Sequence, residues 1–476
     1  MSWEQLFSLM QNEILLVIAA LLLILADLFT DKSKKYLIIH TAHLLFAGVF
    51  LASLSMLDKE GGLFGGSFKT YPLVAFLKST LMVGVLLIML QSVTWVKEKL
   101  IPHGFVSEFY VLLWSSLAGL FFMISSGDFL MFYLGLELSA LPVAGMAAFE
   151  FYRRRSSEAA VKMIMLAAMS SAVMLFGISL IYATSGSIYF DKIQLATEMP
   201  FLELVGFMMM LGGIFFKISL VPFHFWTADV YEGAPTVIAN YLSVISKAAA
   251  VYILMILLFI TLRRYEQTWT IAIYLLSVLT MFAGNFFALR QKNMKRFLAF
   301  SSIAQAGFIL LGVIGGNVLG IKTVIYFLMI YIFSNVAAFG VVHIIAMHSG
   351  KENIDDYEGL YRTNPKLSLI LMLSLFSLAG IPPVAGFFGK FFLYSTAAAK
   401  GYYWLVFLAV VNVTISLYYY LLPVRAAFLR TSEQPIPYFK SDVYSKIGFI
   451  ILAVGLILIG LYSPLYEYIA KISEIL

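Results

Sequence analysis

The sequence predicts an all-α membrane protein that crosses the bilayer many times, and three observations support this. First, 61% of the 476 residues are hydrophobic and 12% are charged, whereas soluble chains are about 45–50% apolar and about 25% charged. Second, apolar windows of about 20 residues, the length of a bilayer-crossing helix, recur along the whole chain. Third, the polar connections between these windows are short, so we expect no soluble domain between them.

We expect about 14 transmembrane helices. They cover residues 12–30, 36–56, 73–95, 105–125, 127–149, 158–184, 203–223, 235–262, 268–289, 294–315, 321–347, 365–399, 402–429 and 443–470. If the N-terminus lies outside, the inner loops hold 19 lysines and arginines and the outer loops hold 8. Because positive charge favours the cytoplasmic side, we expect both termini on the outer, periplasmic side.

Two of these helices contain prolines that predict a break. Pro222 lies at the polar end of the seventh window, and Pro382-Pro383 lies inside the twelfth window, which is too long for one straight span. Proline removes a backbone donor and clashes with the preceding turn, so a helix breaks there. Broken backbone at membrane depth is tolerated where protein or water covers it. We therefore expect both breaks inside the helix bundle.

The two broken helices also predict an internal repeat. Each is the fourth helix of a block of five, one block being windows four to eight and the other windows nine to thirteen. Because five is odd, the blocks enter the membrane from opposite faces, as in transporters with inverted repeats. The predicted organisation is a three-helix segment (1–104), two inverted five-helix repeats (105–262 and 263–430) and a C-terminal transmembrane helix (431–476).

Ionisable residues inside the windows are the candidate functional residues. A charge at the centre of a transmembrane helix costs about 2.5–3.5 kcal/mol on insertion scales, and such residues commonly handle ions or protons. Lys78 and Lys162 lie near window ends, where an ammonium group can reach the surface, and we expect Lys78 to have no functional role. The deeper residues are Glu137, Lys217, Lys247 and Lys390.

Buried glutamate and lysine side chains can form a proton path. Burial disfavours the charged form of each, so a Glu–Lys contact holds a lysine charged and its separation releases the proton. Such groups, spaced by hydroxyl and amide side chains and waters, can pass protons along the bundle. His224, beside Pro222, is a further relay candidate.

Other chemistries are not expected of this chain. It has no cysteine, which excludes iron–sulfur ligation, thiol catalysis and disulfides. It shows no Walker loop, no dinucleotide fingerprint and no histidine set suited to haem. The net charge of +6 reflects loop orientation, so nucleic-acid binding is not expected. We expect neither a cofactor nor a metal ion in this chain.

Five stretches carry a resemblance to a known family. They are Phe216-Lys-Ile-Ser-Leu-Val-Pro-Phe-His-Phe-Trp226 with its continuation to Thr236, Ser246-Lys-Ala-Ala249, Leu134-Gly-Leu-Glu-Leu138, Lys295-Arg-Phe-Leu-Ala-Phe-Ser-Ser302 and Gly380-Ile-Pro-Pro-Val-Ala-Gly-Phe-Phe-Gly-Lys-Phe391. The chain resembles the subunit N family of proton-pumping NADH–quinone oxidoreductase, or respiratory complex I. The resemblance implies an antiporter-like subunit of the membrane arm, in the bacterial inner membrane. NADH, FMN, iron–sulfur clusters and quinone would belong to partner subunits, which include homologous antiporter-like subunits.

The resemblance also implies residue roles. Glu137 matches the glutamate of the family's fifth helix, and Lys162 matches the lysine of its sixth. Lys217, Lys247 and Lys390 match the lysines of the seventh, eighth and twelfth helices. Gln305 stands where many members have histidine; glutamine cannot titrate, so a relay there must use water or hydroxyl groups.

Two other functions stay open on the residues alone. One is a free-standing or Mrp-type cation/proton antiporter, which shares the fold and the buried lysines. The other is a structural membrane subunit that conducts no protons, although a scaffold would not require so many buried charges.

Overall fold

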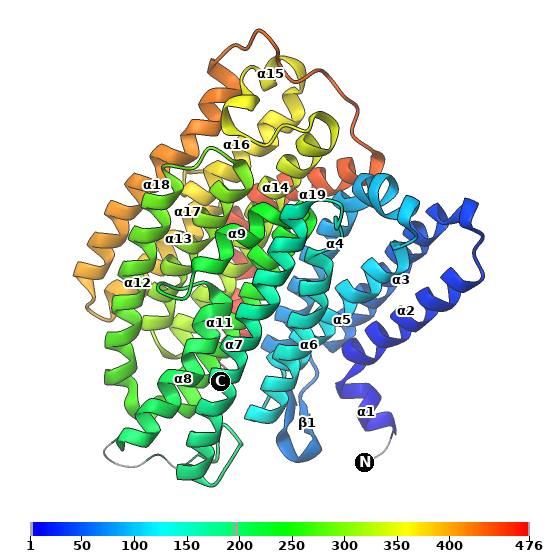
Figure 1. Ribbon diagram of the computed structural model, residues 1–476. Helices are drawn as coiled ribbons and strands as arrows, with labels where there is room; N and C mark the ends of the chain where they lie inside the picture. The colour runs from blue at the N-terminus through cyan, green and yellow to red at the C-terminus, as the bar shows by residue number, and fades with distance from the viewer. Residues whose placement is uncertain (1–2, 194, 196–198, 475–476) are drawn as a thin grey trace.

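The computed structural model describes residues 3–193, 195 and 199–474, and most of these residues are helical (Figure 1). The helices of the N-terminal half are α1 (Trp3–Leu9), α2 (Gln11–Leu28), α3 (Tyr36–Ser53), α4 (Pro72–Trp95), α5 (Val106–Ile124), α6 (Phe129–Ala147), α7 (Arg154–Ser185), α8 (Phe201–Ile218) and α9 (Phe225–Gly233). Those that follow are α10 (Thr236–Tyr241), α11 (Lys247–Ile256), α12 (Glu266–Ala288), α13 (Met294–Ile314), α14 (Asn317–Ser349), α15 (Leu360–Thr363), α16 (Pro365–Ala379), α17 (Ala385–Ala399), α18 (Tyr403–Leu429), α19 (Val443–Leu461) and α20 (Ser463–Ser473). Two short antiparallel strands, β1 (Gly61–Leu63) and β2 (Phe68–Thr70), form a hairpin between α3 and α4.

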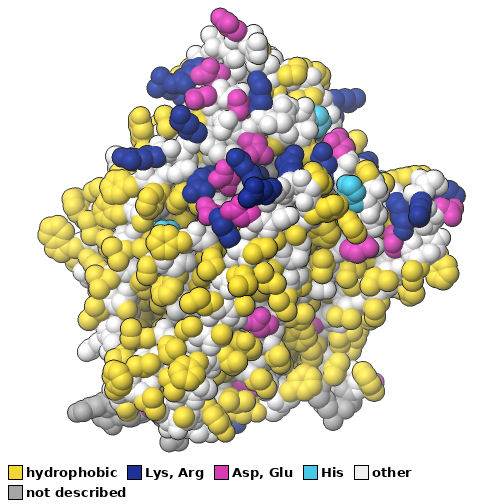
Figure 2. All heavy atoms as spheres, in the orientation of Figure 1, with side chains coloured by type: hydrophobic (Ala, Val, Ile, Leu, Met, Phe, Trp, Pro, Cys, Tyr) yellow, Lys and Arg dark blue, Asp and Glu magenta, His cyan; other side chains and the backbone are white. Residues whose placement is uncertain are grey.

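The predicted fold class, an all-α polytopic membrane protein, is confirmed. Thirteen helices in the described residues are long and apolar enough to cross a membrane, and the shorter apolar helix α16 begins the remaining predicted span. One of the thirteen, Thr236–Thr261, joins α10 and α11 through a π-helical turn at Leu242–Ser246. Figure 2 shows the matching surface, with hydrophobic side chains over the lower part and charged side chains gathered towards the top.

Both predicted helix breaks are present, and they have the same geometry. Helix α8 ends at Ile218, earlier than the predicted 223, and Ser219 follows with φ 69°. Helix α16 ends at Ala379, and Gly380 follows with φ 87°. A left-handed residue directly after a helix lets the next amides bond the last free carbonyls. Each break is then followed by its proline, at Pro222 or Pro383.

The helix pairs α5–α6 and α12–α13 pack in equivalent ways. A Cβ on Gly119 would meet the backbone nitrogen of Ser139 at 2.4 Å, and one on Gly284 would meet that of Ala304 at 2.5 Å. Each residue of the second contact lies 165 positions after its counterpart in the first. Five crossings separate the starts of α5 and α12, so the second pair runs in the opposite direction. This symmetry supports two inverted repeats; the segment boundaries at 104, 262 and 430 stay predictions.

The most deeply buried spans lie in the centre of the bundle. In the most apolar window of each span, 100% of the residues of α13, 94% of those of α14 and 89% of those of the α10–α11 span are buried. The corresponding share is 28% in both α2 and α7, which lie at the periphery. The central spans therefore offer an interior without lipid contact, where polar side chains can be held against one another.

Candidate functional site

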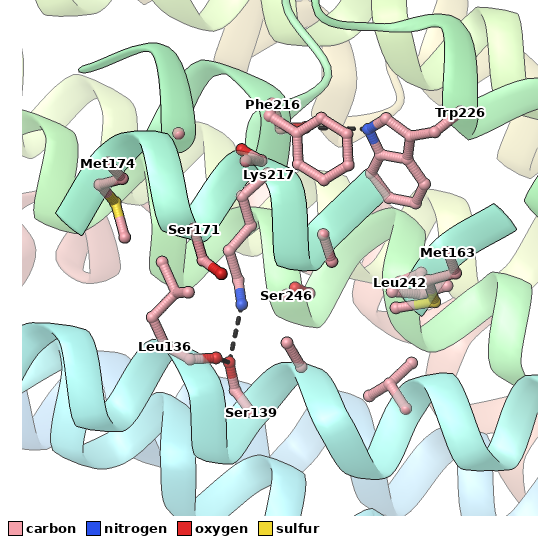
Figure 3. Close-up of a pocket in the computed structure, with 15 residues that line it drawn as sticks. Leu136, Ser139, Met163, Ser171, Met174, Phe216, Lys217, Trp226, Leu242 and Ser246 are labelled. Atoms are coloured by element: carbon pink, nitrogen blue, oxygen red, sulfur yellow. Dashed lines mark hydrogen bonds between the residues drawn. The ribbon is translucent and has the colours of Figure 1, made fainter. Parts of the chain in front are cut away.

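Lys217 projects from the last turn of α8 towards α6, directly before the first helix break (Figure 3). Its Nζ donates a hydrogen bond of 2.7 Å to Oγ of Ser139. A cavity of about 50 Å³ adjoins the ammonium group, and the hydroxyl-bearing Ser171 and Ser246 are among the residues that line it. A site needs about 10–15 Å³ to hold one water, so this cavity can hold a few beside Lys217.

The break itself is held in place by Trp226 of α9. The Trp226 indole Nε1 donates a hydrogen bond of 3.0 Å to the backbone carbonyl of Phe216, and the two rings stack with centroids 5.3 Å apart. Thr227 donates from Oγ1 to Oγ of Ser219, at 2.7 Å. These contacts satisfy one terminal carbonyl of α8 and fix the two half-helices around Lys217.

Glu137 does not touch Lys217 in the described structure. It lies two positions before Ser139 on α6, and its Oε1 is a buried oxygen without a hydrogen-bond partner. A serine hydroxyl, rather than the carboxylate, is therefore the immediate partner of the ammonium group.

Lys247 begins α11 directly after the π-helical turn, and its side chain is 3% exposed. Its Nζ donates a hydrogen bond of 2.8 Å to Oγ of Ser302 on α13. The ring of Tyr231 lies 5.8 Å from the ammonium nitrogen. Ser302 is 165 positions after Glu137, so the second repeat has a hydroxyl where the first has the carboxylate.

Further polar side chains form hydrogen bonds near Ser139 and near the π-helical turn that precedes Lys247. Oγ of Ser116 donates to the backbone carbonyl of Ser139 at 2.8 Å and lies 2.9 Å from the hydroxyl of Tyr241. Two residues further along, Oγ of Ser243 accepts a hydrogen bond of 2.7 Å from the amide of Asn335. Tyr241 lies directly before the π-helical turn and Ser243 lies within it, so both precede Lys247 in the same span.

The second break holds the third lysine. Lys390 of α17 is 3% exposed, and its Nζ donates to the last carbonyls of α16, those of Leu378 at 2.7 Å and Ala379 at 3.2 Å. The C-terminal end of a helix carries partial negative charge, which compensates a buried cation there. Gln305 donates from Nε2 to the same Leu378 carbonyl and to the hydroxyl of Tyr420, both at 2.9 Å.

Tyr420 extends this group towards Lys247. Its hydroxyl lies 2.5 Å from Oγ of Ser301, the neighbour of Ser302 in α13. Of these two adjacent serines, Ser302 accepts the hydrogen bond of Lys247 and Ser301 contacts Tyr420. Tyr420 in turn accepts a hydrogen bond from Gln305. We refer to the residues of these contacts, which extend from α5 to α17, as the polar axis: Ser116, Ser139, Lys217, Tyr241, Ser243, Lys247, Ser301, Ser302, Gln305, Asn335, Lys390 and Tyr420.

Lys162 and His224 lie outside the polar axis. The Nζ of Lys162 pairs with Glu158 at 2.7 Å and with Asp229 of α9 at 2.9 Å, and its side chain is 40% exposed. His224 is buried directly before α9, where its ring lies 4.5 Å from that of Phe225. Its Nδ1 has no hydrogen-bond partner in the part of the chain that is described. The relay roles of both residues stay predictions.

Comparison with known proteins identifies the family of this chain. Residues 126–416 match the family model described as NADH:quinone oxidoreductase/Mrp antiporter, transmembrane. The chain belongs to the NADH:quinone oxidoreductase/Mrp antiporter family. Two relatives named NADH-quinone oxidoreductase subunit N are each 43% identical: that of Phocaeicola vulgatus over 97% of both chains and that of Azobacteroides pseudotrichonymphae over 98% of both.

Chains of two solved membrane complexes share this fold. A chain of respiratory complex I from Thermus thermophilus superposes with a TM-score of 0.79 at 27% identity, over 96% of this chain and 98% of that one. A chain of the Mrp complex from a Dietzia species superposes with a TM-score of 0.85 at 19% identity, over 98% and 97%. The latter likeness concerns the fold alone.

Two parts of this antiporter-family chain differ from what the sequence indicates. The sequence suggested that the ammonium group of Lys78 reaches the membrane surface, but the structure shows it in a buried ion pair. Its Nζ lies 2.5 Å from Oε1 of Glu13, and both side chains are 2% exposed. The sequence feature that could have indicated this pair is Glu13, an acidic residue at the start of the first apolar window. In addition, Asp229 binds Arg296 at 2.8 Å as well as Lys162, so one carboxylate joins α7, α9 and α13.

No cluster of three or more metal-ligating side chains occurs within residues 3–193, 195 and 199–474.

Proposed function

We propose that this chain is an antiporter-like membrane-arm subunit of an NADH–quinone oxidoreductase and that its polar axis carries protons. The supporting observation is the state of its three deep lysines. In the described structure Lys217, Lys247 and Lys390 each donate to a hydroxyl or carbonyl oxygen, and none forms an ion pair. Each ammonium group thus has neutral oxygen atoms, rather than a carboxylate, as its hydrogen-bond partners.

The contacts give each residue of the axis a role. The ammonium groups of the lysines hold a proton, and hydroxyl groups such as those of Ser139, Ser302 and Tyr420 can both accept and donate one. Gln305 does not titrate; its amide holds the Tyr420 hydroxyl beside the Leu378 carbonyl to which Lys390 donates. Waters in the cavity beside Lys217 would connect this lysine to the surface.

Glu137 fits the proposal as a movable charge. Its carboxylate lies on the same helix as Ser139 but without a hydrogen bond at Oε1. A shift that brings the carboxylate to Lys217 would stabilise the ammonium, and its withdrawal would favour proton release. Lys162 and His224 are proposed as accessory relays, on the side of α7 and α9.

The relatives supply the rest of the proposal. Because they are named as subunits of NADH-quinone oxidoreductase, we assign this chain to such a complex, together with homologous antiporter-like subunits. NADH, FMN, iron–sulfur clusters and quinone would then belong to partner subunits, and their reaction would supply the energy. The proposed location is the bacterial inner membrane, with both termini on the periplasmic side.

Reconstitution distinguishes this function from autonomous antiport. The purified chain alone and the intact complex are placed in separate vesicles, and internal pH is followed with a fluorescent dye. The complex should move protons when NADH and quinone are added, and the chain alone should not exchange Na⁺ for protons. Robust sodium-driven proton movement by the isolated chain would instead make it a cation/proton antiporter.

A further inference from the structure

A groove of about 520 Å³ opens where α16 and α19 begin, beside the segment that joins α18 to α19. In Figure 1 this segment runs over the top of the bundle next to α15. The groove is separate from the polar axis. Three lysines line it, one from each adjoining element: Lys366 from α16, Lys440 from the connecting segment and Lys446 from α19.

The three lysines are exposed, and no salt bridge to any of them occurs among the described residues. The nearest acid in the sequence, Asp442, is already engaged: it accepts hydrogen bonds from Thr94 at 2.9 Å and from the backbone nitrogen of Ser445 at 2.9 Å. The groove therefore carries uncompensated positive charge. Both flanking helices also point their N-terminal ends, which carry partial positive charge, to this side of the bundle.

Away from the lysines, the groove is apolar. Leu367, Ile370, Phe449 and Ile450 are among its lining side chains. Below it, α19 exposes further apolar side chains along its length, from Ile447 to Leu461. Asn364 fixes the upper edge, since its Nδ2 donates to the backbone carbonyl of Pro437 at 3.1 Å. The lysines thus lie at one end of a row of exposed apolar side chains that continues along α19.

We propose that this groove binds an anionic diacyl phospholipid of the adjoining leaflet. The lysine ammonium groups would hold the phosphate, and the acyl chains would lie against α16 and α19. Basic pockets between transmembrane helices at a membrane surface have the chemistry to bind acidic headgroups. Free inorganic phosphate would satisfy the lysines but leave the apolar lining uncovered, whereas a phospholipid matches both parts of the groove.

The test is lipid binding to the purified chain in neutral detergent, measured by native mass spectrometry. Phosphatidylglycerol, phosphatidylcholine and inorganic phosphate are the probes. The variant is Lys366→Gln with Lys440→Gln and Lys446→Gln. The matched control removes three exposed lysines elsewhere on the same face, by Lys32→Gln with Lys34→Gln and Lys97→Gln.

We expect the wild type and the control to bind phosphatidylglycerol at least about tenfold more tightly than the groove variant, since basic residues near a membrane surface attract anionic lipid. A second variant, Ala453→Trp, fills the groove without changing charge and should also weaken binding. Equal binding of phosphatidylglycerol by the groove variant and the control would overturn the proposal. So would equal affinity for phosphatidylcholine, or displacement of the lipid by millimolar phosphate.

Discussion

Gln305 and Lys390 donate hydrogen bonds to one acceptor, the backbone carbonyl oxygen of Leu378, at 2.9 and 2.7 Å. This carbonyl belongs to the last turn of α16, directly before the second helix break. The break therefore does more than interrupt a helix. It frees an acceptor that gathers a buried cation and an amide, and the amide in turn holds the hydroxyl of Tyr420.

Substitution of Gln305 tests this arrangement. Gln305→Leu removes the hydrogen bonds from the amide to the Tyr420 hydroxyl and to the Leu378 carbonyl. The assembled complex should therefore pump fewer protons per NADH oxidised. Gln305→His should keep most of the pumping, because imidazole can both accept and donate a proton. The measurement is the ratio of proton uptake to NADH oxidation in vesicles, with the exposed Gln434→Leu as control. An unchanged ratio in Gln305→Leu would remove Gln305 from the path.

Ser139 accepts the hydrogen bond of Lys217, so removing its hydroxyl group should impair proton transfer at Lys217. A hydrogen bond to a charged group contributes about 1.5–3 kcal/mol, so Ser139→Ala should slow redox-driven proton pumping by about tenfold or more. Assembly should be unaffected, since the serine also serves α5 through its backbone carbonyl, which alanine retains. Pumping at the wild-type rate would show that the hydroxyl plays no part.

A relay role of Lys162 can be distinguished from the structural role of its surface ion pairs. These are partly exposed and worth about 0–1 kcal/mol each, so Lys162→Ala should leave the thermal stability of the complex almost unchanged. If Lys162 relays protons, as proposed, the same variant should lower proton pumping. The neighbouring Arg155→Ala, which loses a longer 3.6 Å contact to Glu232, is the control. Equal pumping by the two variants would leave Lys162 a structural role only.

The buried pair of Glu13 and Lys78 should stabilise the attachment of α2 to α4. Removing one partner of a buried pair leaves an uncompensated charge and costs about 3–5 kcal/mol. Glu13→Gln should therefore lower the unfolding temperature of the purified chain clearly. Glu13→Leu combined with Lys78→Met should recover much of the loss, because both charges are then absent. A double variant less stable than Glu13→Gln would contradict this account.

The sequence predicted most of the fold, because its signals are local. Apolar windows mark the spans, and Pro222 and Pro383 mark the two breaks, since proline acts on the backbone wherever it stands. The inverted symmetry followed from counting helices. The position of the seventh helix end was less accurate: Ser219 adopts a left-handed conformation that is uncommon outside glycine, so nothing in its residue type indicated that α8 stops there.

The site was predictable only in its charged members. Lysines inside apolar windows are conspicuous in a sequence, because a charge in the membrane costs free energy. The partners of Lys217 and Lys247 are serines, which are common in any helix and attract no notice. Ser139, Ser302 and Tyr420 became candidates once packing placed their hydroxyl groups at hydrogen-bond distance. Glu13 and Lys78 lie 65 positions apart, and their pairing depends on how α2 packs beside α4.

The most direct test of the proton path is the stoichiometry of the complex that carries Lys217→Ala together with Lys247→Ala, with the exposed Lys59→Ala as control. Protons pumped per NADH oxidised are measured in vesicles after assembly has been verified by the subunit composition of the purified complex. The proposed path predicts a clearly lower ratio in the double variant and the wild-type ratio in the control. A fully assembled double variant that pumps at the wild-type ratio would contradict it.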